Sequence, residues 1–529
     1  MASIEIPVGP EKGGHPRGLV VLFGAEMWER FSYYGMRALL VLYLTNSLKW
    51  PRLDALDLYA TYTGLVYLTP LLGGYLADRY IGQRKAILVG GIVIAAGHFT
   101  MVFEPLLNLG LGLIVLGTGF FKPNISTMVG QLYPQGDSRR DAGYTIFYVG
   151  INVGAAISPI VCGILAERYG WHYGFAAAGV GMVLGIINFG FCQRMLGTAG
   201  YGPGRDGATG LRVADWMQVV VLAVIGYGLV YLAIAGAPTV RAGLPKGVAS
   251  LGVVGFWSLL TLPMILAAAI TRRLVDLPPA EAITLREVAA PSQVAPPIVD
   301  PDDSPLPWYR SSIEWQRVVV ILVVSTFSIL FWMAFEQAGG TMSLFADAKT
   351  ERGFLGMTIP AAFFQSINAV FIICLAPLFS VLWTWMDRSR FRLNSAAKMG
   401  LGLVFVGLAF AVMGRADALA GSVGKVGPQW LTMVYLLNTI GEICISPIGL
   451  SLVNKLAPAK IASLMMASWF LCTAAANYLA GKLEGLLHDL EKQGTTINLW
   501  NFLVYSSIGP GILLLIISPL MKKLSHGRL

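Results

Sequence analysis

Long apolar segments recur from one end of the chain to the other, separated by short polar stretches. An apolar run of about 18 residues or more, folded as a helix, can cross the roughly 30 Å hydrocarbon core of a bilayer. The pattern predicts an all-α membrane protein with fourteen transmembrane helices. The predicted spans lie near residues 19–44, 56–78, 86–104, 109–131, 142–166, 172–193, 216–236, 247–270, 316–338, 359–385, 395–413, 429–452, 461–481 and 500–521.

Two polar segments divide the apolar pattern. Residues 194–215 and 274–314 are rich in Gly and Pro, a composition typical of linkers. Between them lie two spans with few polar residues, which we expect to form a lipid-facing appendage. Without this pair, six spans precede and six follow, as in the two six-helix bundles of the major facilitator fold. The predicted units are an N-terminal bundle at 1–200, the inserted pair with its linkers at 201–314, and a C-terminal bundle at 315–529.

The composition agrees with a membrane protein. Hydrophobic residues make up 55% of the 529 residues and charged residues only 13%, and the mean hydropathy is +0.65. A soluble domain has about a quarter of its residues charged. The chain therefore has too few charges for a soluble protein of this length.

The net charge of +9 reflects the placement of Lys and Arg in alternate loops. By the positive-inside rule, these loops and both termini are cytoplasmic, so the basic excess does not indicate nucleic-acid binding. The polar, acidic residues 1–14 do not resemble a cleavable signal peptide. We expect a multi-pass protein of the bacterial plasma (inner) membrane. The basic residues are Arg79, Arg84, Lys85, Arg139, Arg140, Arg272, Arg273, Arg388, Arg390, Arg392, Lys455, Lys460, Lys522 and Lys523.

The sequence contains no pattern typical of an enzyme. Its five cysteines have no paired spacing, which predicts neither a disulfide framework nor a metal site. Metal-ligand spacings, nucleophile motifs and cofactor loops are also absent from the sequence. We expect no enzymatic activity and no cofactor. The cysteines are Cys162, Cys192, Cys374, Cys444 and Cys472.

The first predicted span carries charges that lipid would not tolerate. At about 100° per residue, Glu26, Glu29, Arg30, Tyr33 and Arg37 fall within roughly a third of the helix circumference. Ionisable groups within a span usually face a bundle interior or a watery cavity and mark a functional pathway. Glu–Arg pairs that only stabilise the helix are the alternative.

Three further spans carry charges of interest: Lys122, Glu336, which is the sole acid of its span, and Glu442. Lys122 has no acid in its own helix, so we expect a carboxylate from another helix, and Glu336 is the obvious supplier. Glu442 is the only charge in the span 429–452. The alternatives are a Lys122 side chain that reaches the membrane interface and a Glu442 that is a hydrogen-bonded structural acid.

Several motifs along the chain resemble those of one transporter family. EMWERFSYYG resembles the ExxERFxYYG signature of the proton-dependent oligopeptide transporter (POT) family, a branch of the major facilitator superfamily. The resemblance extends over nearly the whole chain apart from the inserted pair and its linkers. The other matching stretches are GYLADRYIGQRK at 74–85, FFKPNIS at 120–126, FYVGINVGAAISP at 147–159, FWMAFEQ at 331–337, FFQSINAVFIICLAP at 363–377 and GEICISPIGLS at 441–451.

The resemblance implies import of di- and tripeptides coupled to inward proton movement. Arg37 and Lys122 would bind the peptide carboxylate, and Glu442, with Asn152 and Asn368, would bind the α-amino group. A cavity with fixed charges at both ends would select the main chain of a zwitterion over its side chains. Aromatic residues would form the cavity walls: Tyr33, Tyr34, Tyr67, Tyr148, Trp332 and Trp469. Ordinary helix packing is the alternative for each of these aromatic residues.

Coupling requires groups whose protonation changes during the cycle. We expect external protons to bind Glu26, Glu29 or Glu336 and, with peptide bound, to release Lys122 and Arg30 from their acid partners. The two halves would then rock to face the cytoplasm. Arg30 does not deprotonate in proteins, so its role is pairing.

Two other features qualify the resemblance. Asp78, Arg79 and Arg84 belong to the loop motif, which implies a cytoplasmic gate; a cluster that only sets topology is the alternative. Many relatives have a histidine on the second helix, where Ala60 stands here, so proton handling must depend on acids. We expect His98 to be a packed or interfacial residue rather than a substitute.

The expected partners are di- and tripeptides, protons and membrane lipid, and we expect the protein to work as a monomer. Plant relatives with the same signature carry nitrate or other anions, so a proton-coupled carrier of another small anion is an alternative. A lone anion would not need Glu442. A non-transporting membrane receptor is a third possibility, although a receptor would not require paired, titratable charges in mid-membrane.

Overall fold

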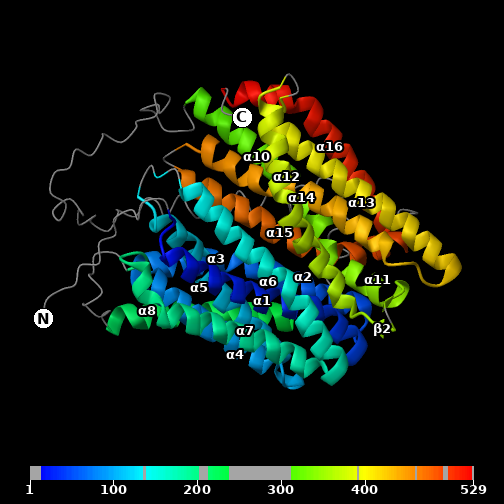
Figure 1. Ribbon diagram of the computed structural model, residues 1–529, viewed down its shortest axis with the longest axis horizontal. Helices are drawn as coiled ribbons and strands as arrows, with labels where there is room; N and C mark the ends of the chain where they lie inside the picture. Colours follow the sequence, from blue (N-terminus) through cyan, green and yellow to red (C-terminus); the bar gives the residue numbers. More distant parts are fainter. Residues whose placement is uncertain are drawn as a thin grey trace, which may run out of the picture.

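The structure is almost entirely helical (Figure 1). It is a computed structural model that describes residues 14–526 apart from 135, 136, 138, 202–212, 237–310, 355, 390, 391, 459, 460 and 493–497. Among the described residues, nine helices are long and apolar enough to cross a membrane by length and composition. The first helix is not among the nine, although 25 residues long, because it carries four charges. The all-α membrane class is confirmed, while the predicted count of fourteen spans is not.

The N-terminal half contains the first six predicted spans. The second of them, 56–78, is divided at Thr69, because Pro70 has no N–H to donate to the helix ladder. π-helical turns at Tyr43–Ser47 and Ala77–Ile81 follow the first and third helices. The helices are α1 (Gly18–Leu42), α2 (Arg52–Leu68), α3 (Pro70–Leu76), α4 (Gln83–Thr100), α5 (Leu107–Gln131), α6 (Arg140–Tyr169) and α7 (Trp171–Phe191).

The C-terminal half contains the last six predicted spans and a short helix that the pattern did not predict. Ser311, Asn394 and Asn498 cap three of the helices, each accepting a hydrogen bond from a backbone N–H in the first turn. The helices are α10 (Ser312–Phe335), α11 (Thr341–Lys349), α12 (Phe364–Asp387), α13 (Ser395–Val423), α14 (Gln429–Leu456), α15 (Ala462–Glu491) and α16 (Leu499–Leu524). A small antiparallel hairpin pairs β1 (Gly353–Phe354) with β2 (Met357–Thr358).

Two helices extend well beyond their predicted ends. α13 was predicted to end at residue 413 and continues to Val423, and α15 was predicted to end at 481 and continues to Glu491. A hydropathy pattern stops where charges begin, but helix-forming residues such as Ala, Leu, Lys and Glu continue a helix out of the membrane. Asp417, in the extension of α13, forms an ion pair with Lys349 at 2.7 Å.

The first inserted helix, α8 (Val213–Ala235), lies against α5. A Cβ on Gly112 of α5 would lie 3.1 Å from the Tyr227 ring, so the two helices are in close contact. Val220, Val224 and Leu232 of α8 are exposed, as expected for a helix that faces lipid. The second predicted inserted helix, 247–270, lies outside the described residues.

Helices α4 and α5 pack with their backbones in contact. A Cβ on Gly90 would lie 2.6 Å from the carbonyl oxygen of Gly117, and one on Gly97 would lie 2.7 Å from that of Gly110. Small residues permit such close approach between membrane helices. These contacts form part of the scaffold that supports Lys122 on α5.

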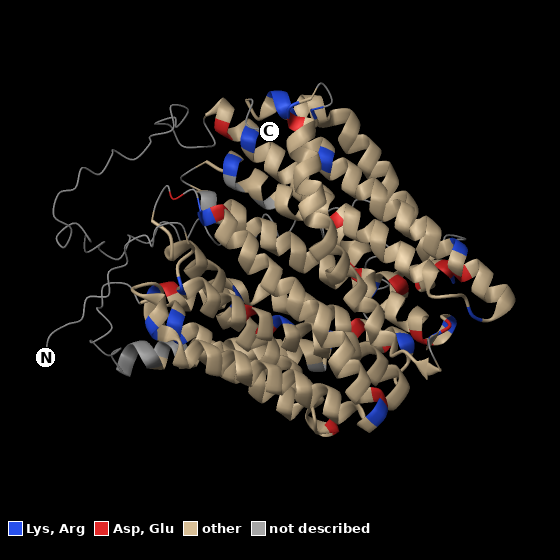
Figure 2. Cartoon of the chain, viewed as in Figure 1, with Lys and Arg blue, Asp and Glu red and all other residues tan. Residues whose placement is uncertain are grey.

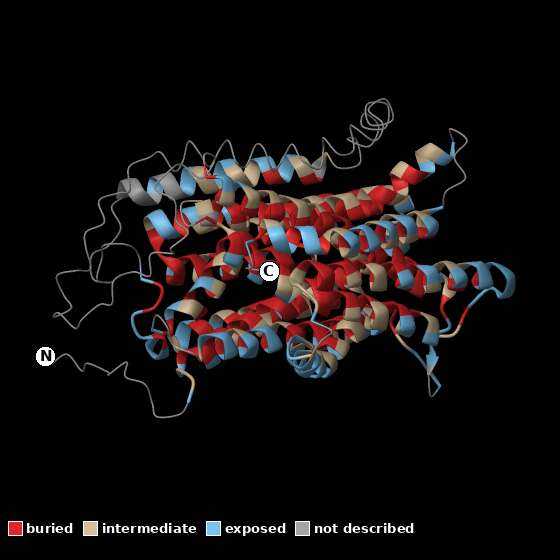
Figure 3. Ribbon diagram, turned by 90° about the horizontal axis from the view of Figure 1, so that it is seen from above, coloured by how far each residue is buried: buried red, intermediate tan, exposed pale blue. Residues whose placement is uncertain are grey.

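The helices run between two faces of the molecule. We call the face where α1 begins and α16 ends the terminal face, and the face with α11 and the β-hairpin the opposite face (Figure 1). Charged residues gather near these faces and few lie midway along the helices (Figure 2). Buried residues run through the middle of both halves, and exposed residues cover their outer surfaces (Figure 3). The few charges that do lie midway are described next.

Candidate functional site

Arg30 lies between two acids on the buried face of α1. Its Nε is 3.1 Å from Glu26 Oε1 and 2.5 Å from Glu29 Oε2. The three residues are only 1–3% exposed. Glu26 Oε2, Glu29 Oε1 and Arg30 Nη2 have no hydrogen-bond partner among the described residues. The cluster therefore retains buried polar atoms that a proton, water or ligand group can satisfy.

A second buried ion pair joins the two halves. Arg37 Nη2 of α1 pairs with Glu336 Oε2, and its Nε donates to the Tyr59 hydroxyl at 2.5 Å. Glu336 begins the 3₁₀ turn Glu336–Gly339 that follows α10. A Cβ on Gly339 would overlap the Tyr59 hydroxyl, so the absence of a side chain there permits this contact.

The expectation that Glu336 pairs with Lys122 is wrong in this conformation. Lys122 Nζ instead lies 4.1 Å from the centre of the Tyr67 ring, and no ion pair of Lys122 is found among the described residues. A cation–π contact partly compensates a buried ammonium that lacks a carboxylate. Lys122 remains within electrostatic range of Glu29 and Glu336. Among the described residues, Lys122 is therefore a cation of the site without a carboxylate in direct contact.

Glu442 and Asn368 lie together in the C-terminal half. The Asn368 amide donates to Glu442 Oε2 and to Thr439 Oγ1, both at 3.0 Å. Glu442 is 8% exposed. The structure thus brings together two of the three residues expected to bind an α-amino group. The third, Asn152, donates to the Tyr148 carbonyl one turn earlier in α6, and no contact with Glu442 is found for it.

The charged groups of the two halves converge around Tyr34. This tyrosine lies within electrostatic range of Arg37, Glu336 and Glu442, and the Arg37 guanidinium is 5.9 Å from the centre of its ring. Tyr148 is also within range of Glu442. Cations of α1 and an acid of α14 therefore border one region between the halves.

The predicted aromatic residues differ in their surroundings. Tyr33 is buried, with its ring centre 6.5 Å from that of Tyr62, whereas Tyr148 is 37% exposed. Trp332 packs edge-on against its helical neighbours Phe331 and Phe335. The ring of Trp469 covers Gly449, which leaves no room for a Cβ there. Both tryptophans thus pack against residues of the C-terminal half.

Arg84 of the loop motif is a structural link at the terminal face. It donates to the carbonyl oxygens of Ala199 and Gly197 at 2.6 and 2.5 Å, and it stacks on the ring of Tyr201 at 4.2 Å. Arg84 therefore ties the start of α4 to the segment that follows α7. Its motif neighbours are exposed: Asp78 accepts a hydrogen bond from Gln83, and the Arg79 guanidinium lies 5.8 Å from the Tyr80 ring.

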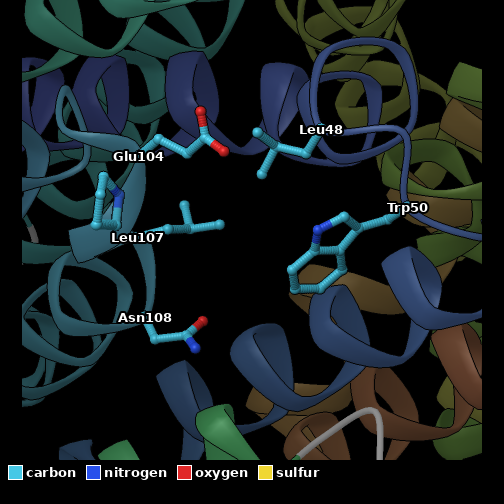
Figure 4. Close-up of a pocket in the computed structure, with 6 residues that line it drawn as sticks. Leu48, Trp50, Glu104, Leu107 and Asn108 are labelled. Atoms are coloured by element: carbon cyan, nitrogen blue, oxygen red, sulfur yellow. The ribbon is translucent and has the colours of Figure 1, made fainter.

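A cavity of about 200 Å³ lies at the opposite face (Figure 4). It has an aromatic and an acidic side, formed by Trp50 and Glu104, with Asn108 beneath them (Figure 4). None of the predicted site residues lines it. The lining residues are Leu48, Trp50, Glu104, Pro105, Leu107 and Asn108.

His98 and three of the five cysteines, Cys162, Cys444 and Cys472, are buried. His98 is fully buried, with Nε2 2.5 Å from Ser32 Oγ, as expected for a packed histidine. The five cysteines are free, and no cluster of metal ligands is found among the described residues.

Sequence reasoning missed two residues that position Arg37 and one ion pair between the halves. Tyr59 and Gly339 position Arg37, and Asp57 of α2 forms an ion pair with Lys482 of α15. Asp57 was detectable as a charge inside the predicted span 56–78. Lys482 directly follows the end of the predicted span 461–481 and therefore lies outside it.

Two helical halves that enclose buried charges define a membrane transporter of the major facilitator type. The chain belongs to the POT family, whose sequence model matches residues 84–205 and 309–499. It is 34% identical to the peptide transporter YePEPT of Yersinia enterocolitica, over 91% of this chain and 90% of that protein. It is 30% identical to a di-/tripeptide transporter of Lactococcus lactis, over 97% of this chain and 98% of that protein.

Solved structures of the same family have the same fold. A crystal structure of a peptide transporter POT in complex with sulfate superposes with a TM-score of 0.74, at 33% identity over 97% of both chains. A POT family transporter in complex with a thioalcohol conjugated peptide superposes with a TM-score of 0.73 at 29% identity, over 97% of this chain and 99% of that chain. These likenesses confirm the predicted fold class.

Proposed function

We propose that the protein is a proton-coupled symporter that imports di- and tripeptides by alternating access. The observation that carries the proposal is the arrangement of buried charges, with Arg37 and Lys122 on one half and Glu442 on the other. A short peptide is a zwitterion whose two charges are separated by a variable side chain. Opposite fixed charges on the two halves suit such a ligand, and the functions of the similar transporters support the same cargo.

Peptide binding would use the groups that lack strong partners. Lys122, whose ammonium lies over the Tyr67 ring, is available to a carboxylate, and Arg37 becomes available when Glu336 is neutralised. Glu442 would bind the α-amino group together with Asn368 and Asn152. The tyrosines Tyr33, Tyr34, Tyr67 and Tyr148 and the tryptophans Trp332 and Trp469 would form walls that tolerate different side chains.

Proton coupling would act through the buried acids. A proton on Glu336 removes its charge attraction to Arg37, which frees Arg37 for the peptide carboxylate and loosens the contact between the halves. Glu26 and Glu29 would exchange a proton in the same way beside Arg30. Lys122 would take part through its electrostatic range to these acids rather than through a direct pair.

The conformation described here supports alternating access. Asn46 donates to Asp347 at 2.7 Å, and Glu167 accepts from Arg352 at 2.9 Å; both bonds join the halves at the opposite face. By the positive-inside rule, the basic loops at the terminal face favour a cytoplasmic position for that face. The protein is then closed to the outside in this state, as a monomer in the bacterial inner membrane. The three predicted units, 1–200, 201–314 and 315–529, would be two moving bundles and a lipid-facing pair, and Asp78, Arg79 and Arg84 would belong to the cytoplasmic gate.

The decisive experiment is uptake of radiolabelled dialanine into proteoliposomes with and without an inward proton gradient. Unlabelled dipeptide, tripeptide, free alanine and nitrate serve as competitors. We expect accumulation that a protonophore abolishes and that only the short peptides inhibit. Inhibition by nitrate alone would instead identify an anion carrier. Folded protein that binds dialanine but shows no gradient-driven uptake would contradict the transport proposal and favour a receptor.

A further inference from the structure

A buried ion pair connects the two halves away from the peptide site. Asp57 Oδ2 of α2 lies 2.9 Å from Lys482 Nζ of α15, and the side chains are 2% and 16% exposed. Neither residue belongs to a recognised motif of the chain. A second, more exposed pair, Arg52 with Glu484 at 2.5 Å, lies nearer the opposite face on the same two helices.

Helices α2 and α15, which carry the two residues of this pair, are in close contact. A Cβ on Gly481 would lie 2.5 Å from Ala60 Cβ and 2.7 Å from the Leu56 carbonyl oxygen. One on Gly64 would lie 3.1 Å from the Tyr478 side chain. Because α2 and α15 touch beside the Asp57–Lys482 pair and again further toward the terminal face, and because the pair is largely buried, little water can screen it. Its attraction is therefore stronger than that of a surface pair.

Opening of the opposite face must separate α2 from α15, because these helices belong to different halves. Separation exposes Asp57 and Lys482 to water and removes their attraction. The pair therefore stabilises the closed state and not the open one, which is the condition for an interaction to shift a conformational equilibrium.

We propose that Asp57 and Lys482 form an outer latch that sets how often the opposite face opens. The latch acts on the alternating-access cycle of the proposed function and does not contact peptide. Close charge pairs at interfaces have measured coupling energies that correspond to tenfold or more in an equilibrium constant. We therefore expect removal of either charge to raise the open-to-closed ratio about tenfold.

The latch is connected to the turn that carries Glu336. Gln337, the next residue, donates to the Ala480 carbonyl of α15 at 2.8 Å. The Thr341 hydroxyl lies within hydrogen-bond distance of two acceptors, Gln337 Oε1 at 3.0 Å and Glu484 Oε2 at 3.1 Å. Residues 480–484 of α15 thus follow any movement of the Glu336 turn. Release of Arg37 from Glu336 would be transmitted to the latch through these hydrogen bonds.

The test measures the distance between two spin labels at the opposite face by double electron–electron resonance, in the absence of peptide. Labels at Ser47→Cys and Ser422→Cys, both exposed and one on each half, are placed in a cysteine-free background. We expect Asp57→Asn and Lys482→Met each to enlarge the long-distance population about tenfold relative to the short one. The charge swap Asp57→Lys with Lys482→Asp is expected to restore much of the original distribution.

The matched control is Lys349→Met, which breaks the Lys349–Asp417 pair within the C-terminal half at the same face. It is expected to leave the distances unchanged. Asp57→Asn keeps the shape of the natural residue. Arg52→Gln, at an exposed site, is a milder second variant, and we expect it to enlarge the long-distance population by a smaller factor. Distributions identical to the unsubstituted protein in folded Asp57→Asn and Lys482→Met would overturn the latch. Because no peptide is used, this outcome is independent of whether the protein transports peptides.

Discussion

The cross-half pair of Arg37 and Glu336 allows the sharpest test of proton coupling. Glu336→Gln keeps the size of the side chain and a hydrogen-bond acceptor but removes the charge. The variant therefore mimics a permanently protonated Glu336. If protonation of this acid drives the cycle, the variant can still bind and exchange peptide but can no longer respond to a proton gradient.

The size of the effect follows from the burial of the pair. Arg37 and Glu336 are 7% and 4% exposed, so solvent screens their attraction only weakly. At an effective dielectric constant of about 20, two unit charges about 4 Å apart attract by roughly 4 kcal/mol, and desolvation offsets part of this. If the Arg37–Glu336 pair favours the closed state by a net free energy of about 1.4–2.8 kcal/mol, its loss changes the equilibrium between the closed and open states by about 10- to 100-fold.

The assay compares two modes of transport in the same proteoliposomes. We expect gradient-driven accumulation of dialanine by Glu336→Gln to fall at least about tenfold. Counterflow, in which unlabelled peptide inside exchanges for labelled peptide outside, needs no proton gradient and should persist. Asp417→Asn, which removes a C-terminal-half acid that pairs within its own half, is the matched control and should retain both modes. Normal accumulation by Glu336→Gln would refute the role of this acid.

Three further substitutions test the binding site and its geometry. Lys122→Gln removes the cation available to the peptide carboxylate, so KM for dialanine should rise about tenfold or more, as for loss of a charge-assisted hydrogen bond; an unchanged KM would exclude this contact. Glu442→Gln should reduce discrimination between dialanine and N-acetyl-dialanine in competition assays, because the acetylated peptide lacks the amino charge; unaltered discrimination would contradict that assignment. Gly339→Ala should lower uptake strongly, because its Cβ would overlap the Tyr59 hydroxyl, whereas Gly353→Ala, with no atom within 4 Å, should not; equal uptake by both variants would show that the close contact is dispensable.

The charged stripe on the first helix was predictable because its geometry is local. Helical periodicity alone places Glu26, Glu29 and Arg30 on one face, and the structure pairs them as i, i+1 and i, i+4 neighbours. The proximity of Asn368 to Glu442 was expected only through the family resemblance, since the two residues lie on different helices.

The partner of Glu336 was not predictable from its own segment. A lone acid in one span and a lone Lys122 in another suggested a pair, but Arg37 takes the acid and Tyr67 faces the lysine. The choice depends on where α10 ends. The 3₁₀ turn at Glu336–Gly339 and the missing Cβ of Gly339 bring the acid beside Arg37 and Tyr59.

The sequence by itself determined most of the long apolar helices and the positions of the charges within them, because hydropathy and helical period act over neighbouring residues; it did not determine α11 or the polar ends of α13 and α15. Only the tertiary structure decided which charges meet across the two halves, as Arg37 with Glu336 and Asp57 with Lys482. Such pairs depend on the relative height and rotation of helices that are hundreds of residues apart in the chain. Those quantities are set by the packing of glycines and aromatic rings between helices, and no local pattern encodes them.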